Sequence, residues 1–188
     1  MTATNERPIP TGEGLTFEKV WAMFQETDHK FQETREQMKE TDRKIGELAN
    51  RFGELAEHLV APGIAERFNE LGFRFDAVAP GGYKIFDDKG KEKTEIDILL
   101  ENGDCIIAVE VKTRPKIQNI NHHIKRLEIL REHRNKHRDT RKIYGAIAGA
   151  VFGREEKQAA VEAGFYVMVQ SGDTMKIELP DDFTPHEW

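Results

Sequence analysis

Two acidic residues and a lysine near the middle of the chain have types and a spacing that suggest metal-ion chemistry. Residues 94–113 read TEIDILLENGDCIIAVEVKT, so Asp97 lies in one apolar run and Glu110 and Lys112 lie in the next. The Asn-Gly pair at 102–103 between these runs is typical of a two-residue hairpin turn. A hairpin that brings two carboxylates together offers hard oxygen ligands to a divalent cation.

The predicted hairpin decides which side chains share a face. With the Asn-Gly pair at its tip, Asp97 faces Ala108 and Glu95 faces Glu110. Because side chains alternate along a strand, these acids share one face with Lys112. Directly opposed residues lie about 5 Å apart and diagonal ones about 7–8 Å apart, so the carboxylates can converge on one ion. The other face is apolar and must be buried; it carries Ile96, Ile98, Leu100, Ile107, Val109 and Val111.

Two interpretations of these charges compete. In one, the hairpin has a solvated face and Lys112 merely pairs with Glu110. In the other, both faces are covered and the acids hold a metal ion, which is favoured by three apolar neighbours on the acidic face, Leu99, Ile106 and Ala108. Few, hard ligands suit magnesium, and zinc is disfavoured because the only cysteine, Cys105, is best interpreted as a core residue.

The spacing of these residues resembles a known superfamily. Asp97, twelve further residues and then Glu110-Val111-Lys112 at the end of an apolar strand resemble the PD-(D/E)XK phosphodiesterases, which include restriction endonucleases, Holliday-junction resolvases and many repair nucleases. The resemblance implies that Asp97 and Glu110 bind Mg²⁺ or Mn²⁺, that the Val111 carbonyl completes the shell, and that Lys112 orients or activates the attacking water. It implies hydrolysis of phosphodiester bonds, most often in DNA. Ile96 departs from the pattern, since the motif has proline there.

The order of predicted elements agrees with the core of that superfamily. We expect an α/β fold, a restriction-endonuclease-like mixed sheet flanked by helices in the order αβββαβαβ. The expected helices cover 52–60, Pro62 to Leu71, 117–133 and 155–163, and the expected strands cover 73–78, 83–87, 95–100, 106–113, 143–152 and 165–170. Strand, helix and strand in succession imply parallel crossover connections.

Further site residues follow from the helices. Many members of the superfamily carry an acid on the helix before the first core strand, four residues after a glycine, and Gly53 and Glu57 match that pattern. Glu54 is the alternative, and a solvated surface glutamate remains the other interpretation. On the helix after Lys112, His123 shares the apolar side, so it either faces the site or is a core histidine.

The segment from the lysine onward is strongly basic. Residues 112–142 hold eleven Lys or Arg against three Asp or Glu, a local net charge of +8 in a chain whose net charge is −6. This charge predicts contacts with a polyanion, most simply with nucleic-acid phosphates, and a solvated helix face is the alternative. The candidate nucleic-acid-binding residues are Lys116, His123, Lys125, Arg126, Arg131 and Arg134.

The amino-terminal third repeats every seven residues. From residue 24 the chain reads FQETDHK, FQETREQ, MKETDRK, IGELANR and FGELAEH. Position a then holds Phe17, Phe24, Phe31, Met38, Ile45, Phe52 and Leu59, and position d holds Val20, Thr27, Thr34, Thr41, Leu48 and Leu55. A strict seven-residue period predicts a coiled coil and therefore a homo-oligomer of unspecified number, although a helix folded back on its own domain is the alternative. The combination of QETDRK-type repeats with this core also resembles a group of bacterial proteins.

These features predict the domain organisation. We expect a disordered segment over 1–14, a coiled-coil helix over 15–51, a PD-(D/E)XK nuclease-like domain over 52–180 and a tail over 181–188. One cysteine, no signal peptide and no membrane-length apolar run predict a cytoplasmic protein. The functional expectation is a metal-dependent nuclease, and the alternatives are a catalytically silent nucleic-acid-binding protein or a coiled-coil assembly protein on the same fold.

Overall fold

The computed structural model describes residues 16–172 and 174–188; for residues 49, 50 and 52 only the backbone is described. The predicted disordered segment 1–14 lies outside the described residues. Two compact units divide the chain, Met1–Ala49 and Asn50–Trp188. No helix in the described part of the chain combines the length and the apolar character that crossing a bilayer requires.

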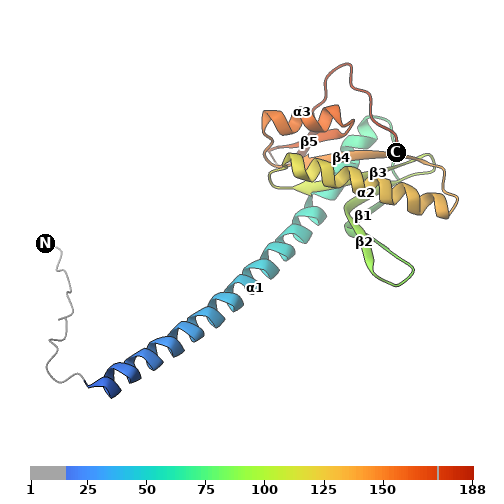
Figure 1. The fold of residues 1–188 in the computed structure, drawn as a ribbon. Helices are drawn as coiled ribbons and strands as arrows, with labels where there is room; N and C mark the ends of the chain where they lie inside the picture. The colour runs from blue at the N-terminus through green and yellow to red at the C-terminus, as the bar shows by residue number, and fades with distance from the viewer. Residues whose placement is uncertain (1–15, 173) are drawn as a thin grey trace, which may run out of the picture. The chain divides into compact units, whose positions relative to one another are not determined.

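Helix α1 runs from Phe17 to Glu70 and enters both units (Figure 1). The predicted break at Pro62 is wrong, because the helix continues through it. Proline removes one backbone donor, but Ile64 and Phe68 in the following turns are completely buried, and this burial outweighs the lost hydrogen bond. The chain leaves the helix near Gly72, whose φ of 94° suits a residue without a side chain.

In the first unit, the residues at position a of the heptads are exposed on α1. Phe17, Phe24, Phe31, Met38 and Ile45 retain between 60% and 76% of their accessible surface. The three threonines at position d donate their hydroxyl hydrogens to helix carbonyls one turn earlier; the acceptors are Met23 for Thr27, Lys30 for Thr34 and Gln37 for Thr41. The polar atoms of these threonines are therefore satisfied within the helix, and their methyl groups remain for packing.

The second unit contains a six-stranded mixed sheet in the order β1-β2-β3-β4-β5-β6. The strands are β1 Ala77–Phe86, β2 Glu92–Glu101, β3 Cys105–Lys112, β4 Lys142–Gly149, β5 Tyr166–Ser171 and β6 Thr174–Ile177. The first three form an antiparallel meander and β3, β4 and β5 are parallel, with α2 (Ile117–Lys136) and α3 (Arg154–Glu162) as the connections. These helices and parallel pairings confirm the predicted strand-helix-strand units.

Two details of the sheet differ from the prediction. The strands expected over 73–78 and 83–87 are one strand, β1, whose pairing with β2 shifts between Pro80 and Tyr83. Gly81 and Gly82, at φ 82° and 90°, absorb the extra residues there. Strand β6 was not predicted and pairs with β5 in antiparallel orientation.

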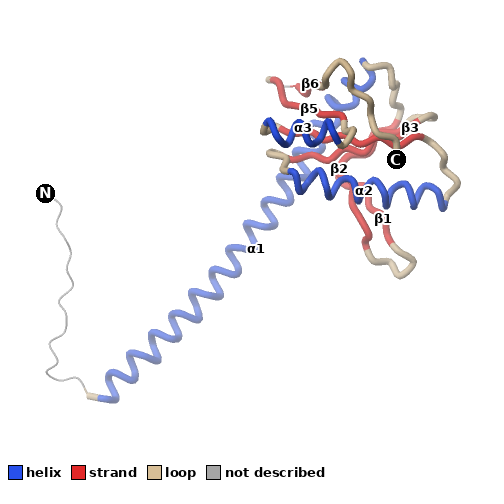
Figure 2. The backbone as a smooth tube through the Cα atoms, turned by 45° about the horizontal axis from the view of Figure 1, so that its top comes forward, coloured by secondary structure: helices blue, strands red, loops and turns tan. Residues whose placement is uncertain are grey.

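Helices cover both faces of the sheet (Figures 1 and 2). On one face, Ile64 and Phe68 of α1 pack against Ile98, Ile107 and neighbouring residues. The other face packs against α2 and α3 through residues that include Leu127, Leu130 and Ala160. Covering both faces confirms that this hairpin has no solvated side at Leu99, Ile106 and Ala108, which are all buried.

The β2–β3 hairpin has a register two residues away from the prediction. Glu101 pairs with Ile106 and Ile98 pairs with Val109, so the turn is centred on 103–104. The Asn102 side chain explains the shift, because its Oδ1 accepts hydrogen bonds from the backbone N–H groups of both Asp104 and Cys105. A shift by two keeps each residue on its predicted face, except that Ile96 packs with Leu99 rather than with Ile98.

The carboxyl-terminal residues, predicted as a tail over 181–188, contact the core. The backbone N–H of His186 donates to the Gly164 carbonyl at 3.1 Å, and that of Trp188 donates to the Ile143 carbonyl at 3.0 Å. The Trp188 ring lies against Phe165, with 5.3 Å between ring centroids.

Candidate active site

Asp97 and Glu110 lie side by side on β2 and β3. The observed pairing of the two strands runs as far as Ile98 and Val109, the residues next to the two acids, and both carboxylates contact Lys112 Nζ. Their residues are only 7% and 2% exposed. Asp97 Oδ2 accepts a hydrogen bond of 2.9 Å from the Val111 backbone N–H, which fixes this carboxylate against β3.

The Lys112 ammonium group contacts an oxygen of each of three neighbouring residues. Its Nζ is 3.0 Å from Asp97 Oδ2, 2.8 Å from Glu110 Oε1 and 3.0 Å from the Val111 carbonyl oxygen. These oxygens belong to the three residues that the sequence predicts as metal ligands. They therefore already surround a single positive charge.

Arg126, on α2, holds the remaining oxygens of the two acids. Its Nη1 forms a hydrogen-bonded ion pair with Glu110 Oε2 and lies 3.4 Å from Asp97 Oδ1. Sequence analysis assigned Arg126 to nucleic-acid binding and missed this contact. The sequence did contain a signal for this contact, because Arg126 lies one helical turn after His123, on the side of α2 that faces the sheet. We call Asp97, Glu110, Lys112 and Arg126 the site cluster.

Burial and neighbouring charges shift the pKa of groups in the site cluster. Burial and the neighbouring Asp97 charge raise the pKa of the Glu110 carboxyl above its ordinary value. Burial alone would lower the pKa of the Lys112 ammonium, but the charges of Glu110 and Asp97 outweigh burial and raise it. Lys112 is therefore protonated at neutral pH, while burial still disfavours the ionised form of Glu110.

Glu57 adds a further acid to this neighbourhood. It lies on α1 within the second unit and is half-buried. Burial first, and then the charge of Asp97, raise the pKa of Glu57 to about 7. Glu54, the alternative, is exposed. Of the two acids, only Glu57 is therefore coupled to the site cluster.

His123 is a core residue. It is completely buried, its Nε2 lies 3.0 Å from the Ala108 carbonyl oxygen, and its ring packs edge-on against Phe165. Burial lowers its pKa to about 4, so the ring is neutral at pH 7. The proposed contact of His123 with nucleic acid is therefore wrong, because no surface of the side chain is accessible. His122, its neighbour in the sequence, is exposed.

The other basic candidates fall into two groups. Lys116 at the start of α2 and Lys125 in its middle are exposed. In contrast, Arg131 and Arg134 are held within the protein: Arg131 donates to the carbonyls of Asp139 and Arg141, and Arg134 pairs with Glu101. Only the first group presents its charge outward.

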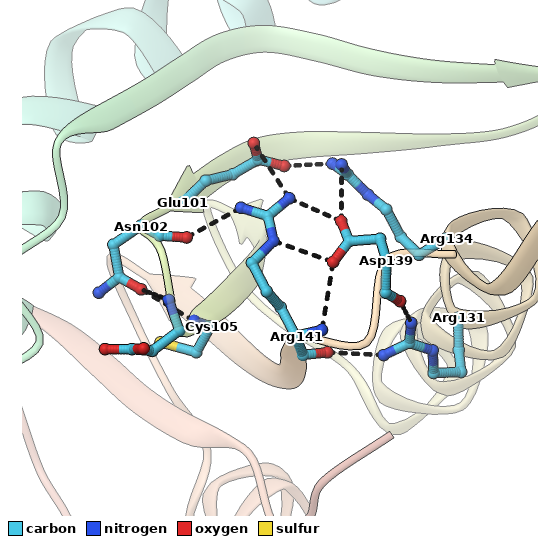
Figure 3. Close-up of polar contacts among 8 residues, drawn as sticks. Glu101, Asn102, Cys105, Arg131, Arg134, Asp139 and Arg141 are labelled. Carbon is cyan, nitrogen blue, oxygen red and sulfur yellow. Dashed lines mark hydrogen bonds and ion pairs between the residues drawn. The ribbon is translucent and has the colours of Figure 1, made fainter. Parts of the chain in front are cut away.

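Arg131 and Arg134 belong to a second ionic cluster, which the sequence analysis missed (Figure 3). Arg141 pairs with Asp139 at 2.7 Å and with Glu101 at 3.8 Å, and Arg134 lies 3.3 Å from Asp139. Hydrogen bonds from Arg141 hold the pKa of the Asp139 carboxyl well below its usual range. We call Glu101, Arg131, Arg134, Asp139 and Arg141 the arginine cluster. It connects the end of β2 to the loop between α2 and β4.

The donor set of the site cluster fits a hard divalent ion that keeps much of its own water. Within the described residues, no three His, Cys, Asp or Glu side chains converge as a complete ligand set. Two carboxylates and one backbone carbonyl do converge, and magnesium typically needs only one or two protein carboxylates. The oxygens around Lys112 Nζ are already arranged about a cation, so their chemistry suits Mg²⁺ or Mn²⁺ and not a thiolate-bound metal.

Comparison with known proteins adds little to this geometry. No family model matches the chain. No curated protein matches it either. Among solved structures, the chain is similar to the small subunit of the heterodimeric restriction endonuclease R.BspD6I, with 18% identity, a TM-score of 0.31 and coverage of 57% of this chain and 59% of that one. The chain thus spans less than two thirds of that subunit.

Proposed function

We propose that this protein is a divalent-metal-dependent nuclease that hydrolyses phosphodiester bonds, most directly in DNA, on a PD-(D/E)XK-type core. One observation supports the proposal above the others. The carboxylates of Asp97 and Glu110 and the carbonyl of Val111 converge on one cationic point, Lys112 Nζ, at 2.8 to 3.0 Å. Two buried acids that share their cationic partners, with a further acid nearby, suit a site that binds a divalent cation and a phosphate.

The proposed roles follow from the charges. When bound, Mg²⁺ or Mn²⁺ supplies Lewis acidity toward the scissile phosphate and the attacking water. Lys112, kept protonated by the two acids, donates hydrogen bonds that orient the water or balance charge on the phosphate. Glu57, with a pKa of about 7, suits the acceptance of the water proton near neutral pH. Lys116 and Lys125 contribute exposed positive charge toward the nucleic-acid backbone.

The test combines metal binding with cleavage. Mg²⁺ and Mn²⁺ are titrated calorimetrically into the wild type and into Asp97→Ala, Glu110→Ala and Lys112→Ala, and the same samples are then incubated with linear, nicked and branched DNA. We expect Asp97→Ala and Glu110→Ala to weaken metal binding by roughly 100-fold or more, because loss of an outer-shell partner alone commonly costs 10–100-fold. All three variants are expected to lose cleavage.

The matched control is Asp104→Ala, which removes an exposed acid from the turn of the same hairpin. It is expected to bind metal and cut DNA like the wild type. Cleavage that persists in Asp97→Ala, Glu110→Ala and Lys112→Ala would sink the enzyme proposal. Circular dichroism of each variant separates lost chemistry from lost folding.

A second candidate function rests on Arg126. Since Arg126 and Lys112 already provide positive charge to both acids, the cluster is also compatible with a catalytically silent protein that binds nucleic acid through its basic surface. Salt-sensitive DNA binding with neither metal affinity nor turnover would select this candidate. RNA and DNA of the same shape are compared in the same binding assay.

We also propose that the exposed seam on α1 mediates self-association. Its large apolar side chains recur at a seven-residue period, and the threonine hydroxyls between them are already satisfied within the helix, so burying the seam leaves no unpaired hydroxyl.

Light scattering after size exclusion is expected to give an oligomer for the wild type and a monomer for Phe24→Glu and Phe31→Glu. Glu36→Ala, at the outward position f, is the control and keeps the oligomer. Association without any nucleic-acid affinity at low salt would favour an assembly protein.

A further inference from the structure

A small apolar pocket adjoins the site cluster on the α1 side of the sheet. Its volume is about 260 Å³. The walls come from α1, from the ends of β3 and β4, and from β5 and β6, and the residues that matter here are Ala56, Val60, Val111, Lys112, Ala148 and Gln170. All of these residues lie within the second unit.

The pocket lies where α/β proteins commonly bind ligands. It opens at the carboxyl ends of the parallel strands β3 and β4, the position at which open α/β sheets place their ligand crevices. Lys112 belongs both to the pocket wall and to the site cluster. Ala56 in the pocket wall precedes Glu57, whose carboxyl interacts electrostatically with Asp97 and Lys112, so a group inside the pocket lies at the same end of the sheet as the site cluster.

The size and chemistry of the pocket narrow its occupant. Its volume is below the range of about 300–1,000 Å³ that encloses a drug-sized molecule, so it suits one small flat group. Small apolar side chains such as Ala56, Val60 and Ala148 form its walls, and the exposed Gln170 offers an amide donor and acceptor at its rim. An apolar slot with one amide at its edge matches the faces and the polar edge of a nucleobase.

We propose that this pocket receives an unpaired nucleobase of the strand being cut, one nucleotide from the scissile phosphate. The inference rests on the proposed nuclease function and specifies its substrate class as DNA that is locally unpaired at the cut. Withdrawing a base from an intact duplex costs a few kcal/mol, and this cost is smallest when the base has no partner. The basic segment 112–142 has no Phe, Trp or Tyr side chain on which a base could stack. The pocket would supply an apolar contact to a base instead.

The test measures binding without cleavage. Duplexes carry the fluorescent base 2-aminopurine either fully paired, opposite a one-nucleotide gap or in a short flap, and they are titrated with the protein in EDTA. We expect the wild type to bind the gap and flap substrates about 10-fold more tightly than the paired duplex, because a base without a partner enters the pocket without the cost of unpairing. The 2-aminopurine emission should rise as the base leaves the stack.

The variants separate the pocket from the rest of the surface. Ala56→Phe fills the pocket and is expected to remove both the preference and the rise in emission. Gln170→Leu removes only the rim amide, so a reduced preference is expected; because Gln170 is exposed, this variant preserves the test if Ala56→Phe misfolds. Ala77→Phe adds the same ring at an exposed alanine outside the pocket and should behave like the wild type.

Three outcomes decide the matter. A wild type that binds paired and unpaired DNA equally, or a folded Ala56→Phe variant that keeps the preference, overturns the pocket even if Mg²⁺ supports cleavage. A preference in EDTA that Ala56→Phe removes supports the pocket even if no metal supports cleavage, in which case only the hydrolysis proposal fails. Absence of DNA binding overturns both.

Discussion

Strand β2 carries an ionic cluster at two places, and the pKa of a carboxyl group shifts in opposite directions at the two. The arginine cluster, where β2 ends, combines two carboxylates with three guanidinium groups, and the pKa of its Asp139 lies well below the usual range. The site cluster combines two carboxylates with two cations and has a third acid nearby. There, burial and like charge raise the pKa of Glu110 and Glu57.

The difference separates an ionic cluster that stabilises the fold from one that is suited to bind a cation. In the arginine cluster the pKa of Asp139 is lowered, so the ionised form of this acid stabilises the folded state. At the site cluster the pKa values of Glu110 and the nearby Glu57 are raised, so the ionisation of these two acids opposes folding, and additional positive charge would favour it. The comparison predicts opposite responses to the same kinds of substitution and the same changes of pH.

The largest expected effect is the loss of Glu101 from the arginine cluster. Glu101→Ala leaves Arg134 and Arg141 without this partner, and breaking a largely buried pair should lower the free energy of unfolding by about 2–3 kcal/mol, as these side chains retain some exposure. Urea denaturation measures the loss. Glu92→Ala, which removes the exposed partner of Lys84, is the control and should change stability by less than about 0.5 kcal/mol.

The second largest effect on the free energy of unfolding is expected when the pH is lowered and Asp139 becomes protonated. Since its pKa is lower in the folded protein than in the unfolded chain, its ionised form contributes stability above about pH 4, and this contribution is lost as the pH falls below that value. We expect a loss of about 1–2 kcal/mol from this residue between pH 5 and pH 2. Urea midpoints should fall less over that range in Asp139→Asn than in the wild type; equal slopes would contradict the assignment.

The site cluster should show the opposite pH dependence, through Glu57. Its pKa of about 7 in the folded protein exceeds that of the unfolded chain, so its contribution is complete below about pH 4 and is lost as the pH rises toward 7. For a half-exposed group we expect about 1 kcal/mol. Denaturation in EDTA at pH 5 and pH 8 measures it, and Glu57→Gln should reduce the difference between the two values.

The smallest effect is expected from neutralising Glu110. In EDTA at neutral pH, Glu110→Gln should raise the free energy of unfolding by at most about 1 kcal/mol, because relief of repulsion by Asp97 is partly offset by weaker hydrogen bonds to Lys112 and Arg126. The same variant should lose metal affinity. A strong loss of stability would show that this acid is compensated like those of the arginine cluster, and the comparison would fail.

Local patterns were sufficient for much of this fold. Alternating side chains identified β2 and β3, and the two faces of this hairpin are as expected apart from Ile96. Helical spacing found α2 and α3, and short apolar runs found β4 and β5. These signals succeed because each depends on a period of two or 3.6 residues that neighbours along the chain already define.

The errors occurred where a distant contact or a single side chain outweighed the local pattern. The Asn102 side chain moved the turn by one residue and so the strand register by two, and tertiary burial carried α1 through Pro62. Strand β6 is short and gains its place by pairing with β5. None of these outcomes follows from propensity alone.

For the candidate site, the sequence by itself determined the acid types, their strands and their common face, because strand alternation brings Asp97, Glu110 and Lys112 to one side of the sheet. Only the tertiary structure decided which cations meet these acids. Arg126 and Arg134 come from the same basic helix, yet Arg126 pairs with the site acids and Arg134 with Glu101. A long, flexible side chain takes the partner that packing of α2 on the sheet brings within reach, and that choice is a property of the assembled layers rather than of spacing along the chain.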